Sequence, residues 1–181
     1  NNHGPGPLCR FFSTLFLSGL LLVATASTRA QQSMDYAVHA NVIYHFTKYI
    51  NWPDNMKSGD FVIGIVGESP LLDKLKIFIA NKTVGNQRIV IRKYSRSAKS
   101  FNCHILFIGD DESGSLKKIA AGTAASSILI VTETEGLCRK GSCINFLIVD
   151  DRLKLEINKK IIEQRHLDIA TELLNLGTVV K

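Results

Sequence analysis

The stretch CHILFIGDDESGSLKKIAAGTAASSILIV, residues 103–131, decides the fold. It opens with a continuous apolar run that ends in acidic residues, and it closes with a second apolar run. Between the two runs, residues 115–125 have the apolar spacing of a helix. A strand, a helix and a second strand in this order imply two parallel strands with a helix packed on their sheet.

The same alternation continues on both sides of this stretch. We predict helices over 34–52 and 70–82, strands over 60–70 and 88–95, a hairpin over 143–158 that turns at Asp151-Arg152, and one or two helices over 158–180. The predicted fold class is α/β. It is a single three-layer domain whose mixed, mostly parallel sheet is flanked by helices, with an antiparallel hairpin near the C-terminus.

The N-terminal part of the chain has the pattern of an export signal. Residues 11–26 form an uncharged apolar run, FFSTLFLSGLLLVATA, which follows Arg10 and precedes the small residues of STRA. This order is typical of a secretory signal peptide, here residues 1–30. The run of 16 residues is shorter than the ~20 that a membrane-spanning helix needs, and an uncleaved anchor is the alternative. We therefore predict a periplasmic protein with one domain over residues 34–181.

The charge of the chain is mildly positive. Its formal net charge of +6 falls to +4 without residues 1–30, because Arg10 and Arg29 leave with them and no acidic residue does. Lysines and arginines are interspersed with acids, as in DDRLKLEINKKIIEQR, and form no dense basic run. The sequence therefore lacks the usual pattern of a nucleic-acid-binding protein, and we expect no nucleic-acid partner.

Two cysteines, Cys138 and Cys143, stand close together in GLCRKGSC. A zinc site would need two more ligands, and no other histidine or cysteine lies between His104 and His166. A redox centre of the thioredoxin type prefers C-x-x-C at the start of a helix, whereas this pair precedes an apolar strand. In an oxidising periplasm the two should form a disulfide that contributes roughly 2 kcal/mol. Cys103 is left without an obvious partner.

Acidic and glycine residues follow the predicted strands, where α/β proteins bind ligands. Gly64 and Gly67 in IGIVGES have G-x-x-G spacing, which predicts a tight turn rather than a nucleotide site. Helix capping and solubility explain the acids as well as a divalent cation would, so we predict no metal and no cofactor. The acids are Asp110, Asp111, Glu112, Glu133 and Glu135.

The sequence does not predict an enzyme. No G-x-S-x-G motif is present, and no histidine can be paired with an acid by position. His104 lies in a strand and is expected to be a hydrogen-bonded core residue, while His166 lies between helical segments and is expected to be more exposed. No nucleophile, base and oxyanion donor come together in this pattern.

Five blocks of the sequence, taken in order, resemble the YfiR-like family of periplasmic proteins. These blocks are YHFTKYINWP at 44–53, FVIGIVGES at 61–69, CHILFIG at 103–109, the run from ILIVTETEG to LKLEIN at 128–158, and LDIATELLNLG at 167–177. The resemblance covers about residues 36–178.

The resemblance implies a repressor rather than an enzyme. Members of this family bind the periplasmic sensor region of an inner-membrane diguanylate cyclase and hold it inactive, which lowers cyclic di-GMP signalling and biofilm formation. An outer-membrane lipoprotein can sequester the repressor, and members are described as dimers. By this resemblance Cys138 and Cys143 match a bonded pair. Cys103 matches a cysteine that pairs elsewhere in some members, but that partner is missing here.

A repressor needs an exposed surface for its partner. The candidates are the corner formed by Trp52 and Pro53, where a helix is expected to end, and the C-terminal helical region around His166 and Leu167. Packing of the aromatic ring in the core is the alternative for Trp52. A different function, periplasmic binding of a small ligand, would use the crevice near Gly67, Asp110 and Glu133. A thiol-disulfide enzyme is a third possibility.

Overall fold

A sheet of eight strands runs through the protein, with its strands in the order β10-β8-β7-β6-β5-β2-β4-β3. The computed structural model describes Asn1 and residues 35–180, so the predicted signal peptide, apart from Asn1, lies outside the described residues. The strands are β2 (Phe61–Val66), β3 (Thr83–Val84), β4 (Gln87–Tyr94), β5 (Ile105–Ile108), β6 (Leu129–Thr132), β7 (Ile144–Val149), β8 (Arg152–Ile157) and β10 (Thr178–Val179).

Five neighbouring strands of this sheet are parallel. They are β4, β2, β5, β6 and β7, while β8 is antiparallel to β7 and β3 is antiparallel to β4. Numbered by their order in the chain, the parallel strands are arranged 2-1-3-4-5, which is a common order in doubly wound α/β sheets. In this order the direction of winding reverses between β2 and β5. The prediction of a mixed, mostly parallel sheet is confirmed.

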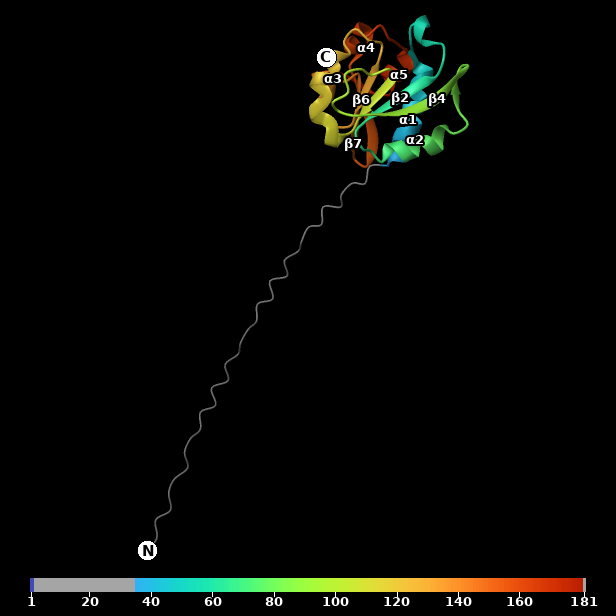
Figure 1. Ribbon diagram of the computed structural model, residues 1–181. Helices are drawn as coiled ribbons and strands as arrows, with labels where there is room; N and C mark the ends of the chain where they lie inside the picture. The colour runs from blue at the N-terminus through green and yellow to red at the C-terminus, as the bar shows by residue number, and fades with distance from the viewer. Residues whose placement is uncertain (2–34, 181) are drawn as a thin grey trace. The chain divides into compact units, whose positions relative to one another are not determined.

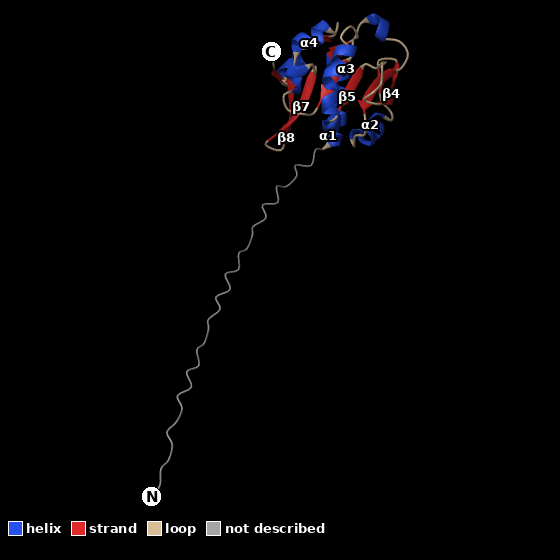
Figure 2. Ribbon diagram, turned by 60° about the vertical axis from the view of Figure 1, so that its left-hand side comes forward, coloured by secondary structure: helices blue, strands red, loops and turns tan. Residues whose placement is uncertain are grey.

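Helices cover both faces of the sheet and make the fold three layers thick. α1 and α2 lie side by side on one face, and α3 lies on the other (Figures 1 and 2). The helices are α1 (Tyr36–Tyr49), α2 (Leu71–Ile79), α3 (Leu116–Gly122), α4 (Lys159–Gln164) and α5 (Thr171–Asn175); short 3-10 turns are η1 (Asp54–Met56), η2 (Asp110–Ser115) and η3 (Leu137–Lys140).

The core forms where the central strands are apolar on both faces. Every residue of β2, β5 and β6 is buried, as expected for parallel strands covered by helices on both sides. α1 contributes Ala40, Ile43 and Phe46, three fully buried residues at helical spacing. The Phe46 ring lies 6.0 Å from the ring of Phe146 on β7, measured between centroids.

The hairpin between β7 and β8 turns one residue earlier than predicted. β7 ends at Val149 and β8 begins at Arg152, so Asp150 and Asp151 form the turn instead of Asp151-Arg152. Both aspartates have positive φ, 51° and 57°, as the central residues of a type I′ turn do. This backbone matches the right-handed twist of the two strands.

The C-terminal region contains short strands that the sequence analysis missed. The span 158–180 was predicted as one or two helices, and it forms α4 and α5 separated by the strand β9 (Asp168–Ile169). β9 pairs antiparallel with β1 (Ile50–Asn51), the two residues that follow α1. α4 ends before His166, whose φ of 56° is incompatible with its continuation. In residues 35–180 no helix is long and apolar enough to cross a membrane.

Candidate functional site

A cavity of about 430 Å³ opens where three parallel strands end. Its walls come from the segments after β2, β5 and β6 and from the first turn of α1. The lining residues are Tyr36, Glu68, Ser69, Pro70, Gly109, Asp110, Asp111, Glu133, Thr134 and Glu135. The carboxyl ends of β2 and β5, where the winding reverses, are the usual position of a ligand site in such sheets. The structure thus brings Asp110 and Glu133 together, as the predicted crevice requires.

Glu133 is the central acid of this cavity. Its side chain is 8% exposed, and its Oε1 accepts hydrogen bonds from the Tyr36 hydroxyl at 3.3 Å and from the Asp110 backbone N–H at 3.1 Å. Its other oxygen, Oε2, is buried and has no hydrogen-bond partner among the described residues. One half of the carboxylate is therefore satisfied, and the other half lacks a donor.

Burial and negative charge shape the electrostatics of the cavity. Burial raises the pKa of Glu133, and Asp110 and Asp111 act in the same direction, while the two hydrogen bonds to Oε1 oppose it. Burial and the nearby Glu133 raise the pKa of Tyr36 to about 12, so its hydroxyl remains a donor. Asp110 is held in place by the Thr134 hydroxyl, which donates to its Oδ1 at 2.6 Å.

The backbone around the cavity leaves little space for larger residues. Gly67 has φ of 73°, and a Cβ at this position would lie 2.7 Å from Cγ of Glu112. This confirms the predicted tight turn after β2. A Cβ at Gly109 would lie 3.2 Å from Oε1 of Glu133. In residues 35–180 no group of three or more acidic, histidine or cysteine side chains could hold a metal ion.

The predicted partner corner is only partly at the surface. Trp52 is 4% exposed, because its ring packs edge-on against Phe61 at 5.0 Å and its Nε1 donates to the backbone oxygen of His104 at 3.3 Å. The ring of Trp52 therefore packs in the core, which is the alternative given for it above, and it does not form an exposed contact surface. Pro53 is half-buried.

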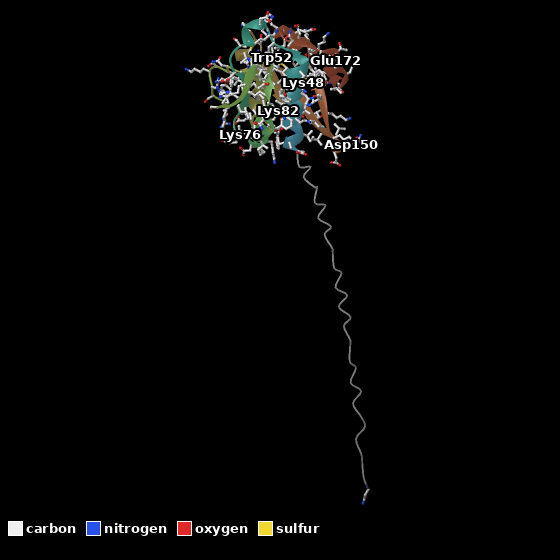
Figure 3. All side chains as sticks on the ribbon, turned by 90° about the vertical axis from the view of Figure 1, so that its right-hand side faces the viewer. Lys48, Trp52, Lys76, Lys82, Asp150 and Glu172 are labelled. Atoms are coloured by element: carbon white, nitrogen blue, oxygen red, sulfur yellow. The ribbon has the colours of Figure 1, made fainter. Side chains whose placement is uncertain are left out.

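The C-terminal part of the predicted partner surface also contains one exposed residue and one buried residue. His166 is exposed, whereas Leu167 is 1% exposed and belongs to the core. The ladder of β1 and β9 places Asn51 opposite Asp168, so the Pro53 and His166 segments, far apart in sequence, are brought to one corner. Figure 3 shows Trp52 and Glu172 toward one end of the domain and Asp150, which follows β7, at the other. We refer to Asn51, Pro53, His166 and Asp168 as the β1–β9 corner.

The three described cysteines are buried free thiols. The predicted bond between Cys138 and Cys143 is therefore not formed in this structure. Cys138 Sγ lies 3.7 Å from the backbone oxygen of Cys143, and the pairing stays a prediction. Burial raises the pKa of Cys138 to about 12 and of Cys143 to about 11, and a catalytic thiol needs the opposite shift. This environment does not favour the thiol-disulfide enzyme.

Cys103 and His104 lie at the opposite end of β5 from the cavity. Burial raises the pKa of the Cys103 thiol to about 12. His104 Nδ1 accepts from the Val62 N–H at 3.0 Å, so its Nε2 carries the proton and donates to the Met56 oxygen at 2.8 Å. The expectation of a hydrogen-bonded core histidine is confirmed.

Sequence reasoning missed the contribution of Tyr36 to the cavity. Tyr36 and Glu133 are 97 residues apart, and only the packing of α1 against the sheet brings them together. Glu68 and Pro70 were also missed as lining residues. Their position directly after β2 was the available signal, because segments that follow neighbouring parallel strands meet at one edge.

The chain belongs to the YfiR/HmsC-like family, whose family model matches residues 36–178. The match begins at the first residue of α1 and ends within β10, so it includes both the cavity and the β1–β9 corner. No curated protein matches the chain.

Proposed function

We propose that this protein is a periplasmic negative regulator that represses an inner-membrane diguanylate cyclase by binding its periplasmic sensor region. Repression would lower cyclic di-GMP signalling and biofilm formation. The observation that carries the proposal is membership of the YfiR/HmsC-like family over residues 36–178. A homodimer and sequestration by an outer-membrane lipoprotein belong to the same proposal.

The mechanism needs no chemistry in the repressor itself. A protein that binds one conformation of a membrane receptor more tightly than another shifts the receptor's equilibrium by the difference in binding free energy. The β1–β9 corner supports such a role, because it combines the exposed polar residues Asn51, His166 and Asp168 with the half-buried Pro53. A polar rim around a rigid anchor is common in protein interfaces.

The test is a pull-down from solubilised inner and outer membranes with the mature protein as bait, in oxidised and reduced form. Mass spectrometry should recover a membrane protein with a cyclase output domain. If no membrane protein is retained specifically in either form, repression by direct binding is wrong.

A pair of histidine variants locates the surface. His166→Asn keeps the positive φ, since asparagine tolerates this backbone conformation. It should weaken recovery of the cyclase, whereas the control His45→Asn, at an exposed position on α1, should not. Equal recovery with both variants would remove His166 from the proposed surface.

The cavity favours a second candidate function, the binding of a small ligand that tunes repression. The supporting observation is its position at the carboxyl ends of β2, β5 and β6 together with a buried carboxylate oxygen without a donor. A ligand that binds the folded state raises the melting temperature by mass action. A compound screen by thermal shift tests this function directly.

A further inference from the structure

The cavity at the carboxyl ends of β2, β5 and β6 has a marked charge. Five carboxylates line it, from Glu68, Asp110, Asp111, Glu133 and Glu135, and its lining contains no lysine or arginine. Glu68 forms an ion pair with Lys93, which stands outside the lining. No ion pair between described residues neutralises the other four. Concave acidic sites attract and concentrate cations.

The unpaired oxygen of Glu133, Oε2, indicates which chemical group a ligand of this cavity would supply. Oε1 has two donors, the Tyr36 hydroxyl and the Asp110 N–H, whereas Oε2 has none although it is buried. A buried acceptor without a partner costs free energy, and the cost is larger for a charged group. The group that would remove this cost is an N–H or O–H donor, and beside four unpaired carboxylates a cationic donor is favoured.

The shape of the site selects among cations. No group of three or more ligating side chains in residues 35–180 could hold a metal ion, so the carboxylates do not form a metal cage. A volume of about 430 Å³ is within the range of small-molecule sites. Tyr36 and Pro70 supply apolar surface beside the acids, which suits an alkyl chain. A concave site of this size fits a small molecule better than a flat protein surface.

We propose that this cavity binds a small organic cation with a primary ammonium or guanidinium group, which supplies the donor that Glu133 Oε2 lacks. Asp110, Asp111 and Glu135 surround the bound charge. The inference deepens the ligand-binding candidate function. It is independent of repression, because it concerns binding by the protein alone.

The experiment is isothermal titration calorimetry of the purified protein at low ionic strength, with agmatine as the probe. The matched control compound is 1,4-bis(trimethylammonio)butane, because it carries two positive charges on a four-carbon chain, as agmatine does, but has no N–H donor. We expect saturable binding of one agmatine and at least about tenfold weaker binding of this control. Equal affinity for the two compounds, or no binding of agmatine, would overturn the proposal.

Three variants locate the site. Glu133→Gln should weaken agmatine binding by about tenfold or more, because it removes a buried charged acceptor. Asp111→Asn, an exposed lining residue, should weaken it by about twofold to threefold, as expected for a partly screened charge. Glu163→Gln, an exposed change on α4 away from the cavity, should have no effect. If Asp111→Asn and Glu163→Gln behave alike, the site is not this cavity, even where Glu133→Gln disturbs the fold.

The pH dependence gives a further readout. The pKa of Glu133 is raised, and the groups that face it are Tyr36 from α1 and Asp110 and Asp111 from η2. Affinity for agmatine should fall as the pH is lowered and Glu133 takes up a proton, while the ammonium and guanidinium of agmatine stay charged. A higher affinity at lower pH would contradict the proposed contact.

Titrations with other classes of ligand distinguish failure of this inference from failure of the ligand-binding function on which it rests. If Mg²⁺ or Ca²⁺ displaces agmatine and binds more tightly, the ligand of this cavity is a metal ion and the organic-cation proposal is wrong. Binding of a lysine- or arginine-rich peptide without binding of agmatine would assign the cavity to a protein partner. A neutral or anionic compound whose thermal shift is lost in Glu133→Gln would overturn the cation class and leave ligand binding intact.

Discussion

Trp52 shows how a residue at a predicted helix end can belong to the core. The predicted helix reaches Trp52, but α1 ends at Tyr49 and Ile50–Asn51 form β1. The Trp52 ring fills the core next to Phe61 and His104. The indole N–H keeps a hydrogen-bond partner in the His104 carbonyl, which makes its burial tolerable. The buried ring therefore anchors the chain directly after β1, next to the β1–β9 corner.

Trp52→Ala should destabilise the protein by about 3–5 kcal/mol, because it leaves a large cavity in the core, although the His104 oxygen keeps the Leu129 N–H as a donor. Urea unfolding measures the loss. Trp52→Phe should cost less, since it keeps most of the packing, and Ile77→Ala, whose side chain is 76% exposed, should change stability by no more than about 0.5 kcal/mol. A Trp52→Ala protein as stable as Ile77→Ala would contradict the burial of the ring.

His104 gives the protein a dependence on pH that its hydrogen bonds explain. Its neutral form fits, because Nδ1 accepts from Val62 and Nε2 donates to Met56. Protonation would place a second N–H against the Val62 N–H. Burial lowers the pKa of His104 below its usual 6.5, and burial lowers the pKa of His39 in the same direction. The folded state thus binds fewer protons than the unfolded state, so this stability is complete above pH 6.5 and is lost as the pH falls below it.

The free energy of unfolding should therefore decrease less steeply with acidification in His104→Gln than in the parent protein. The slopes of the two proteins should differ by at most about 1.4 kcal/mol per pH unit, which corresponds to the uptake of one proton on unfolding. Comparing slopes rather than absolute values removes the opposing contribution of Glu133, whose raised pKa favours the folded state at low pH. The control is His45→Gln, at an exposed position. Parallel curves for His104→Gln and the parent protein would show that His104 does not titrate with folding.

At the scale of elements, α3 and α4 are joined by a buried arginine. Arg165, 4% exposed, follows α4 and donates to three oxygens at the C-terminal end of α3: the backbone oxygen and hydroxyl of Thr123 and the backbone oxygen of Ala120. The last carbonyls of a helix lack partners within the helix and carry partial negative charge. The Arg165 guanidinium donates hydrogen bonds to oxygens at this helix end, so it has acceptors without a carboxylate partner.

Arg165→Met should cost about 1–3 kcal/mol of stability, because the Ala120 oxygen and the Thr123 hydroxyl oxygen lose the guanidinium as donor, while the Thr123 carbonyl keeps the Ser126 N–H. Arg152→Met on the exposed position of β8 is the matched control and should be nearly neutral. Hydrogen exchange should show faster opening of α3 in the Arg165 variant alone. Equal stability of the two variants would mean that water replaces the guanidinium.

The elements that sequence reasoning predicted well are those with a local signal. β2, β5 and β6 are apolar runs, and α1 and α2 have helical spacing, so each is visible without knowledge of the rest of the chain. β1, β9 and β10 have two residues each and no periodicity, and only pairing with distant segments makes them strands. The acids of the cavity were predictable from their position after parallel strands, whereas Tyr36 depends on the packing of a whole helix.

At the scale of the whole molecule, α1 connects the two candidate sites. Its first residue, Tyr36, lines the cavity, and the residues after its last turn pair with β9 at the corner. A helix of 14 residues spans about 21 Å, so the two sites lie at opposite ends of the sheet. A ligand that fixes Tyr36 would act on the corner only through the position of this helix. Coupling between the sites would appear as an effect of agmatine on recovery of the cyclase.

The predicted Cys138–Cys143 bond would act on the molecule through its unfolded state. Cys138 lies in η3, which follows β6, and Cys143 directly precedes β7. The backbone there is already held by Asn158, whose Nδ2 donates to the Cys138 oxygen at 2.9 Å. Closing so short a loop restricts the unfolded chain and should contribute about 2 kcal/mol, with little change in the folded structure. Unfolding in urea with and without dithiothreitol measures this contribution, and peptide mapping after alkylation identifies the bonded residues. Cys103→Ser should keep the full response to reductant, and Cys143→Ser should abolish it. If instead the response disappears in Cys103→Ser, Cys103 takes part in the bond and the assigned pair is wrong.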